Sequence, residues 1–291
     1  MTSLTELTFG CHSIDKSCTD RFSNVLEQYG SSFLPQLQVL DMRNAFKDAD
    51  SAQRFFGCVG KQGGFASVKE LRLGKESHTY HRYPMVSFCP SVVFTEGAFT
   101  GFQRLILREM ILPPNSLAAL CRALEQSPCV KNLKLLELQA CDVPGAGLEA
   151  LGGLFAKSLL PSLQKLNLNG NPGIKDAGLV RLAEAVKVGG AHAAPALKKL
   201  LLSNTGIGPV GLNSLMSAVE MACFPVLEEL DLSYSAKFDS AKEADEFAAS
   251  ILMHCPHLAK LTLPAKPGTG AMQVNQGGKG KAKKLNVPIR R

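Results

Sequence analysis

The sequence predicts an α/β solenoid of about nine repeats, with a curved parallel sheet on the inside and helices on the outside. Two periodic patterns predict this fold. A short apolar motif returns every 30 to 34 residues, and an amphipathic helical pattern follows most copies of it after 15 to 18 residues. Because one strand and one helix cannot bury their own apolar faces, neighbouring units have to stack into a continuous core.

The short motif has apolar residues at its first, fourth and sixth positions. Such alternation over a short run is typical of a β-strand with one buried face. A random distribution of leucine would not keep so narrow a period along the whole chain, so we interpret the copies as true repeats. The nine copies begin at Leu4, Leu37, Val68, Phe102, Leu133, Leu163, Leu197, Leu227 and Leu258.

The second pattern places apolar residues at positions i, i+3, i+4 and i+7, which lie on one face of a helix. It follows seven of the nine motifs, in a looser form after the fifth. We expect Asn115 and Asp176 to be helix N-caps, because their side chains can accept hydrogen bonds from free backbone N–H groups. The predicted helical faces begin at Phe22, Ala52, Leu117, Leu148, Leu179, Leu212 and Ala244.

Three repeats resemble the ribonuclease-inhibitor-like class of leucine-rich repeats. In this class an Asn or Cys side chain satisfies backbone groups in the turn after the strand. The resemblance covers residues 1–264 and implies the fold more specifically than the function, since the class includes inhibitors, sensors, GTPase activators and scaffolds. The period is a few residues longer than in the class, and the first four repeats match poorly after the strand. The matching segments are Leu163 to Asn171 with Gly178-Leu179, Leu133 to Cys141 with Gly147-Leu148, and Leu197 to Leu202 with Gly211-Leu212.

The charge divides the chain into a solenoid, residues 1–264, and a basic Gly-rich tail, residues 265–291. The net charge is +7, but all 25 acidic residues lie in the first part. Seven of the 32 lysines and arginines lie in the tail, which leaves 25 to balance the acids of the solenoid. The tail's composition predicts that it is unordered by itself.

Four arginines are predicted on the concave face of the sheet: Arg43, Arg72, Arg104 and Arg108. Arg104 is at the third position of its motif, Arg72 is at the fifth, and Arg43 and Arg108 are at the seventh. Because alternate residues of a strand share a face, these positions lie on the same side of the sheet. A row of guanidinium groups suits an acidic protein surface or a phosphate backbone. The alternative is an ordinary solvated sheet, in which Asp41, Glu70 and Glu137 pair with these arginines.

Residues 75–101 lack a helical period and contain several aromatic residues and two prolines. We interpret this segment as an extended convex stretch that replaces a helix. The alternative is a contact loop whose aromatic residues anchor a protein partner.

No motif indicates catalysis, a cofactor or a small-molecule substrate. The glycine-rich stretches fit no phosphate-binding pattern. His78, His81 and Cys89, and separately His254, Cys255 and His257, lack a credible fourth ligand, so we expect no metal site. The sequence contains no run of 18 apolar residues, so it predicts no membrane-spanning segment. The odd number of scattered cysteines, nine in all, and the absence of a secretory signal at the N-terminus predict a cytoplasmic protein with free thiols.

These observations predict a non-catalytic scaffold or adaptor that holds protein partners within a multi-subunit assembly. Contacts are expected on the concave face and in the 75–101 segment, while the tail anchors to an acidic neighbour. Two alternatives remain open, and both use the tail: a ribosome-like ribonucleoprotein component that binds RNA, and a microtubule-associated scaffold of the cytoskeleton or flagellum. The tail residues expected to bind are Lys279, Lys281, Lys283, Lys284, Arg290 and Arg291.

Overall fold

The computed structural model describes residues 3–9, 14–62, 65–75, 88–97, 99, 101–113, 115–235, 238, 240–264 and 272–275. The chain divides into two compact units, Met1–Cys141 and Asp142–Arg291, here called unit 1 and unit 2. Both are built from the same element, in which a short strand is followed by a helix and a return loop. We describe each unit by itself.

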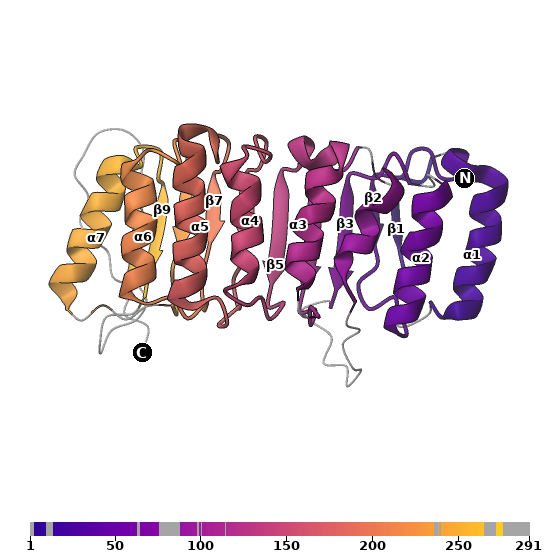
Figure 1. Cartoon of the computed structure of the whole chain (residues 1–291), viewed down its shortest axis with the longest axis horizontal. Helices are drawn as coiled ribbons and strands as arrows, with labels where there is room; N and C mark the ends of the chain where they lie inside the picture. Colours follow the sequence, from indigo (N-terminus) through magenta and orange to yellow (C-terminus); the bar gives the residue numbers. More distant parts are fainter. Residues whose placement is uncertain are drawn as a thin grey trace. The chain divides into compact units, whose positions relative to one another are not determined.

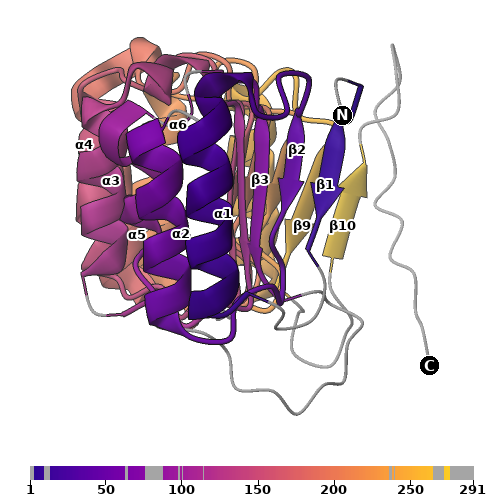
Figure 2. The same cartoon turned by 90° about the vertical axis from the view of Figure 1, so that its right-hand side faces the viewer.

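Unit 1 contains five parallel strands in its described residues, with helices along one face of the sheet (Figure 2). The strands are β1 (Glu6–Thr8), β2 (Val39–Asp41), β3 (Glu70–Gly74), β4 (Arg104–Arg108) and β5 (Leu135–Gln139). The helices are α1 (Lys16–Tyr29), α2 (Ala49–Gln62) and α3 (Ser116–Gln126), with 3-10 helices η1 (Gly30–Ser32), η2 (Pro90–Gly97) and η3 (Pro128–Asn132).

The described residues of unit 2 form four parallel strands and a fifth that runs the other way. The parallel strands are β6 (Lys165–Asn167), β7 (Lys199–Leu201), β8 (Glu229–Asp231) and β9 (Lys260–Leu263). The helices, which stand side by side in Figure 1, are α4 (Gly147–Ala156), α5 (Lys175–Gly189), α6 (Pro209–Glu220) and α7 (Ala241–His254), and η4 spans Gly190–His192. The last strand, β10 (Met272–Asn275), pairs antiparallel with β9.

The predicted fold class, an α/β leucine-rich-repeat solenoid, is confirmed. Every described parallel strand begins two residues after the start of its motif, and every predicted helical face lies in a helix. The strands pair so that equivalent motif positions are neighbours: Glu70 lies beside Arg104, and Lys199 beside Glu229. The repeat period therefore sets the register of the sheet.

The core lies between the sheet and the helices of each unit. The motif's first, fourth and sixth residues point into it, as Leu37, Leu40 and Met42 do in the second repeat, all at most 1% exposed. Burial of such side chains stabilises a fold by about 1.5–3 kcal/mol each. In unit 2 the helices α4 and α5 also approach closely, since a Cβ atom added at Gly152 would lie 2.7 Å from the Cβ of Ala185.

Residues 88–97 differ from the extended stretch that the sequence predicts. They contain the 3-10 helix η2, which contacts α2 and α3 and so takes the place of a helix in this layer. Phe88, Phe94 and Phe99 are at most 8% exposed and face the core of unit 1. The phenylalanines described in this segment are therefore core residues, which corrects the alternative that they anchor a partner. Residues 76–87 lie outside the described residues.

The two predicted helix N-caps are also corrected. Asn115 precedes α3 as expected, but its side chain makes no capping hydrogen bond. Asp176 lies inside the first turn of α5 and does not cap it. Its Oδ1 atom instead accepts hydrogen bonds from the backbone N–H groups of Gly208 and Gly211, each 2.7 Å away at the start of α6. Asp176 thus holds the helix of the next repeat.

Candidate functional site

The strand face of unit 1, meaning the face of its sheet opposite the helices, carries the four predicted arginines. Arg72 lies on β3, Arg104 and Arg108 lie on β4, and Arg43 lies in the turn two residues after β2. The register brings Asp41 beside Arg72 and Glu70 beside Arg104. The structure therefore gathers the predicted residues on neighbouring strands, as the alternation of side chains requires.

Carboxylates link these arginines into a ladder. Arg43 Nη2 lies 2.6 Å from Asp41 Oδ2, and Arg72 Nη1 lies 3.3 Å from the same oxygen. Glu70 bridges two arginines, with 2.6 Å from Oε1 to Arg72 Nε and 2.6 Å from Oε2 to Arg104 Nε. The pairing that the sequence left as an alternative is thus present.

The ladder continues at both ends. Arg72 Nη1 also lies 3.3 Å from Glu6 Oε1 on β1. At the other end, Arg108 on β4 donates a hydrogen bond to Glu137 on β5. Every arginine of the row therefore has a carboxylate partner, and the row is close to neutral at long range.

The two signs of charge lie at different depths. The side chains of Asp41, Glu70 and Glu137 are 3%, 11% and 1% exposed. The arginines are more open: Arg104 is 46% exposed and Arg108 34%. From β2 to β5, a molecule that touches this face therefore meets guanidinium groups first, with the carboxylates beneath them; Glu6 on β1, which is 53% exposed, is the exception.

The buried carboxylate of Asp41 is ionised by its neighbours. Burial alone would raise its pKa, but hydrogen bonds from the side chain and backbone of Arg43, and from Arg72, lower the pKa of Asp41 below its ordinary value. Burial opposes the charge of Arg72 as well, and the contacts with Glu70 and Asp41 outweigh it and raise the pKa of Arg72. The pKa shifts of Asp41 and Arg72 therefore both favour the charged forms of this pair.

The strand face of unit 2 has lysines where unit 1 has arginines. Glu229 lies between Lys199, at 2.8 Å, and Lys260, at 2.7 Å. Burial opposes its ionisation, and hydrogen bonds from the two lysines lower the pKa of Glu229. Glu229 therefore pairs with lysines from both neighbouring strands.

The turns after the strands contain the side-chain hydrogen bonds that the resemblance implies. Asn171 Nδ2 donates to the carbonyl of Leu168 at 2.7 Å, and its Oδ1 accepts from the backbone N–H of Val143 at 3.0 Å. Cys141 and Thr205 occupy the same place in the neighbouring repeats, and their side chains donate to backbone carbonyls. These residues have a structural role.

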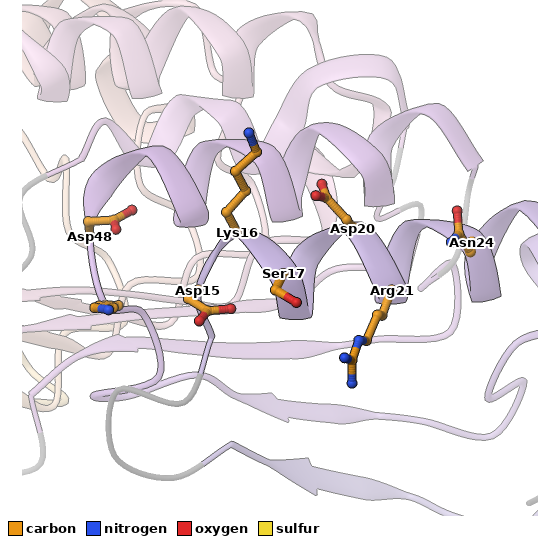
Figure 3. A pocket seen from close by; sticks show the side chains of 8 residues that line it. Asp15, Lys16, Ser17, Asp20, Arg21, Asn24 and Asp48 are labelled. Atoms are coloured by element: carbon orange, nitrogen blue, oxygen red, sulfur yellow. The ribbon is translucent and has the colours of Figure 1, made fainter.

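A shallow surface hollow lies at the start of α1, lined by charged side chains of both signs (Figure 3). Two of its carboxylates, those of Asp15 and Asp48, bind the backbone at the start of a helix. Asp15 accepts a hydrogen bond from Cys18 N at 2.9 Å, and Asp48 accepts one from Ser51 N at 2.8 Å. The bond from the backbone of Cys18 lowers the pKa of Asp15. We assign no ligand to this hollow.

The other predicted positions give no site. Among the residues that the structure describes, no three His, Cys, Asp or Glu side chains form a group that could hold a metal ion. His254 contacts the carbonyl of Ser250 through Nδ1 at 2.9 Å, and Cys255 is buried. His78 and His81, and the tail residues 279–291 with their six predicted binding side chains, lie outside the described residues.

Two features escaped the sequence interpretation. β10 lies in the tail, and its four residues alternate between apolar and polar side chains, which could have predicted a strand. A groove between α6 and α7 has no local sequence pattern, because its walls come from two repeats. It is described below.

Comparison with known proteins identifies one repeat directly. A family profile for the leucine-rich repeat matches residues 160–183, which contain β6 and the first half of α5. No curated protein matches the chain with significant similarity. No helix in the described ranges is long and apolar enough to cross a membrane.

Leucine-rich repeats are generally non-catalytic modules that bind proteins, so the family suggests an interaction role. The profile matches a single repeat, but the same strand and helix recur at the period of the motif in both units. The match and the recurrence together show that this chain belongs to the leucine-rich-repeat proteins.

Proposed function

We propose that this chain is a non-catalytic scaffold that binds an acidic protein partner on the strand face of unit 1. The observation that carries the proposal is the difference in depth between the two charges of the ladder. From β2 to β5, carboxylates that are 1% to 11% exposed hold arginines that are 19% to 46% exposed. The guanidinium groups are fixed before any partner arrives.

Fixed guanidinium groups favour binding for an entropic reason. A long side chain that is ordered on binding costs about 0.5–1.5 kcal/mol, and the internal ion pairs of the ladder reduce this cost. Arginine also has five N–H donors in a planar fork, so one carboxylate inside the protein does not use them all. Arg104 can therefore hold Glu70 and still donate to a carboxylate or carbonyl of a partner.

The near neutrality of the ladder predicts how the partner binds. Long-range attraction is weak when each positive charge lies beside a negative one, so the association rate depends little on salt. The specificity comes from short-range contacts with the guanidinium groups. The alternatives that involve RNA or microtubules depend on the tail, and no described residue favours either of them.

The experiment compares two arginines that have similar exposure and a carboxylate at the same distance but lie at different positions in unit 1. Arg104 on the strand face is 46% exposed with a carboxylate at 2.6 Å, and Arg54 on helix α2 is 48% exposed with a carboxylate at 2.6 Å. The tagged full chain, Arg104→Ala and Arg54→Ala are used for quantitative affinity purification. The proteins recovered by the full chain are then identified and purified for titration.

We expect Arg104→Ala to lose an acidic partner that Arg54→Ala retains. A binding loss of about 2 kcal/mol, typical of an interface hot spot, corresponds to about 30-fold in Kd. Equal recovery by the two variants, or equal affinity in titration, would overturn the assignment of the strand face.

A further inference from the structure

A groove of about 240 Å³ lies between α6 and α7 in unit 2. The two helices are neighbours at the end of the row of unit 2 helices (Figure 1). Leu212, Met216 and Phe247 are among the apolar side chains that line the groove, and Glu243 and Glu246 add acidic groups from α7. This volume is below the ~300–1,000 Å³ of typical small-molecule pockets. It suits side chains of a peptide.

The acidic character belongs to the start of α7. This helix contains Glu243, Asp245 and Glu246 in its first two turns and one lysine, Lys242. Glu246 lies 3.5 Å from Lys242, but the two side chains are 66% and 85% exposed. Exposed pairs of this kind contribute little, so this pair does not neutralise the groove. Its occupant should be apolar along the groove and basic at the end that lies near the start of α7.

Residues 283–291, Lys-Lys-Leu-Asn-Val-Pro-Ile-Arg-Arg, have this composition. Leu285, Val287 and Ile289 are two residues apart, so in an extended segment they share one face. Pairs of basic residues flank them on both sides. Pro288 has no N–H group, which is no disadvantage in a groove between helices, where no sheet hydrogen bonds are made.

The position of β10 allows this segment to reach the groove. β10 ends at Asn275, which pairs with Lys260 at the start of β9. α7 ends at His254, six residues earlier, and its 14 residues extend about 21 Å. Packed layers are separated by about 10 Å. The nine residues 276–284 span about 30 Å when extended at about 3.3 Å per residue, which covers this path.

We propose that residues 283–291 of the same chain occupy the α6–α7 groove, with Leu285, Val287 and Ile289 over its apolar floor and Arg290 and Arg291 beside Glu243 and Glu246. The acidic neighbour that the sequence predicts for the tail then lies in unit 2 itself. The proposal goes beyond the scaffold function and does not depend on it, because the strand face of unit 1 contributes no residue.

The test measures amide hydrogen exchange in the full chain, followed by proteolysis and mass spectrometry of the fragments that cover residues 283–291. We expect exchange at least tenfold slower than in the free peptide of the same sequence. Glu246→Lys, Arg290→Glu with Arg291→Glu, and Ile289→Gln should each restore fast exchange. Combining Glu246→Lys with the two tail reversals should slow exchange again, since opposite charges then face each other.

A matched control separates the groove from general electrostatics. Glu220 is an exposed acid at the end of α6 and does not line the groove, so Glu220→Lys should leave the exchange unchanged. Unprotected residues 283–291 in the natural chain would overturn the proposal, and so would protection that Glu246→Lys and Glu220→Lys reduce equally. Protection that disappears on dilution would place the segment on a second copy and would also overturn it.

Discussion

Unit 1 and unit 2 share a repeat but stabilise it by different means. In unit 1 phenylalanines fill the space between the sheet and the helices. The ring of Phe55 contacts the rings of Phe22, Phe56 and Phe46, with centroid distances of 4.8, 5.3 and 5.7 Å. In the described part of unit 2 the ring pair is Phe238 with Phe247. There the core is mostly leucine.

The residues of the turns differ as well. In unit 2, the side chains of Asn171, Thr205 and Ser235 bind backbone groups of the turn or of the adjacent repeat. The first repeats of unit 1 lack this residue pattern, although Asn44 has a positive φ as Asn204 does at the equivalent position. Unit 1 therefore keeps the left-handed turn residue without these side-chain bonds, and its core is rich in aromatic rings.

The largest expected effect is in the aromatic core. Phe55 is 1% exposed and contacts at least five other rings. Phe55→Ala should lower the free energy of unfolding by about 3–5 kcal/mol, the usual range for a buried phenylalanine. Urea denaturation followed by circular dichroism measures the change. Tyr29→Ala, at an exposed position of α1, is the control, and a loss of similar size there would contradict the role of the cluster.

Asn171→Ala tests the turn bonds of unit 2. The change leaves the N–H of Val143 and the carbonyl of Leu168 without this partner in a buried site. An unsatisfied buried group costs about 1–3 kcal/mol, so we expect a loss of about 2–3 kcal/mol in the same urea assay. Asn213→Ala, on the exposed side of α6, should change stability little. If both variants lose equally little, the turn bonds do not stabilise unit 2.

The third prediction exchanges a residue of unit 1 for its counterpart in unit 2. Asp41 and Asn167 hold the same motif position, and each accepts a hydrogen bond from the backbone N–H two residues later, at 3.1 and 3.0 Å. Asp41→Asn should keep this bond and lose the charge that holds Arg43 and Arg72. We expect about 2 kcal/mol lower stability at pH 7, in the range for hydrogen bonds to charged groups.

The loss of stability caused by Asp41→Asn should become smaller in acid. Because the folded state lowers the pKa of Asp41, its ionisation stabilises the fold above the unfolded pKa of about 3.9, and this contribution is lost as the pH falls through the lower folded pKa. The stability difference between the natural chain and Asp41→Asn should therefore shrink below about pH 4. A difference that stays constant from pH 7 to pH 3 would show that the charge of Asp41 contributes nothing.

The smallest expected effect is on the rate at which cysteine thiols are labelled, and it involves no change in the free energy of unfolding. Burial raises the pKa of Cys121 and Cys141 to about 12 and that of Cys255 to about 11, so few thiolates are present at pH 8. Among the described cysteines, Cys18 is exposed and should be the first to react with iodoacetamide. In mild urea, labelling of Cys121 before Cys255 would show that unit 1 opens first, and simultaneous labelling would show that the two units unfold together.

The sequence predicts those parts of the fold that depend on neighbouring residues. The strands begin where the motif places them, because Leu40 and its equivalents alternate with polar residues on a period of two. Asp176 could not be placed in this way. An acid at the start of a helix suggests a cap for that helix, but its partners, Gly208 and Gly211, are 32 and 35 residues away. η2 was missed because short 3-10 helices have no clear apolar period.

The candidate site was predictable in position but not in its balance of charge. The motif period places Arg72 and Arg104 on one face, and the register then makes Glu70 a neighbour of both. Which acids bind which arginines depends on side-chain conformations that no local pattern reveals. The depth difference between Asp41 and Arg104 also arises from packing across strands.

The contacts of Asp176 have a consequence for how such a chain can be shortened or lengthened. The carboxylate that positions the start of α6 is encoded one repeat earlier, so a repeat is not a self-contained module. A deletion or duplication of a whole period that joins the chain between residues 177 and 207 separates Asp176 from the glycines it binds, unless the incoming repeat also supplies an acid at that place. Successful recombination should therefore exchange segments that begin before Asp176 and end after Gly211, even though the strand motif by itself would permit any junction.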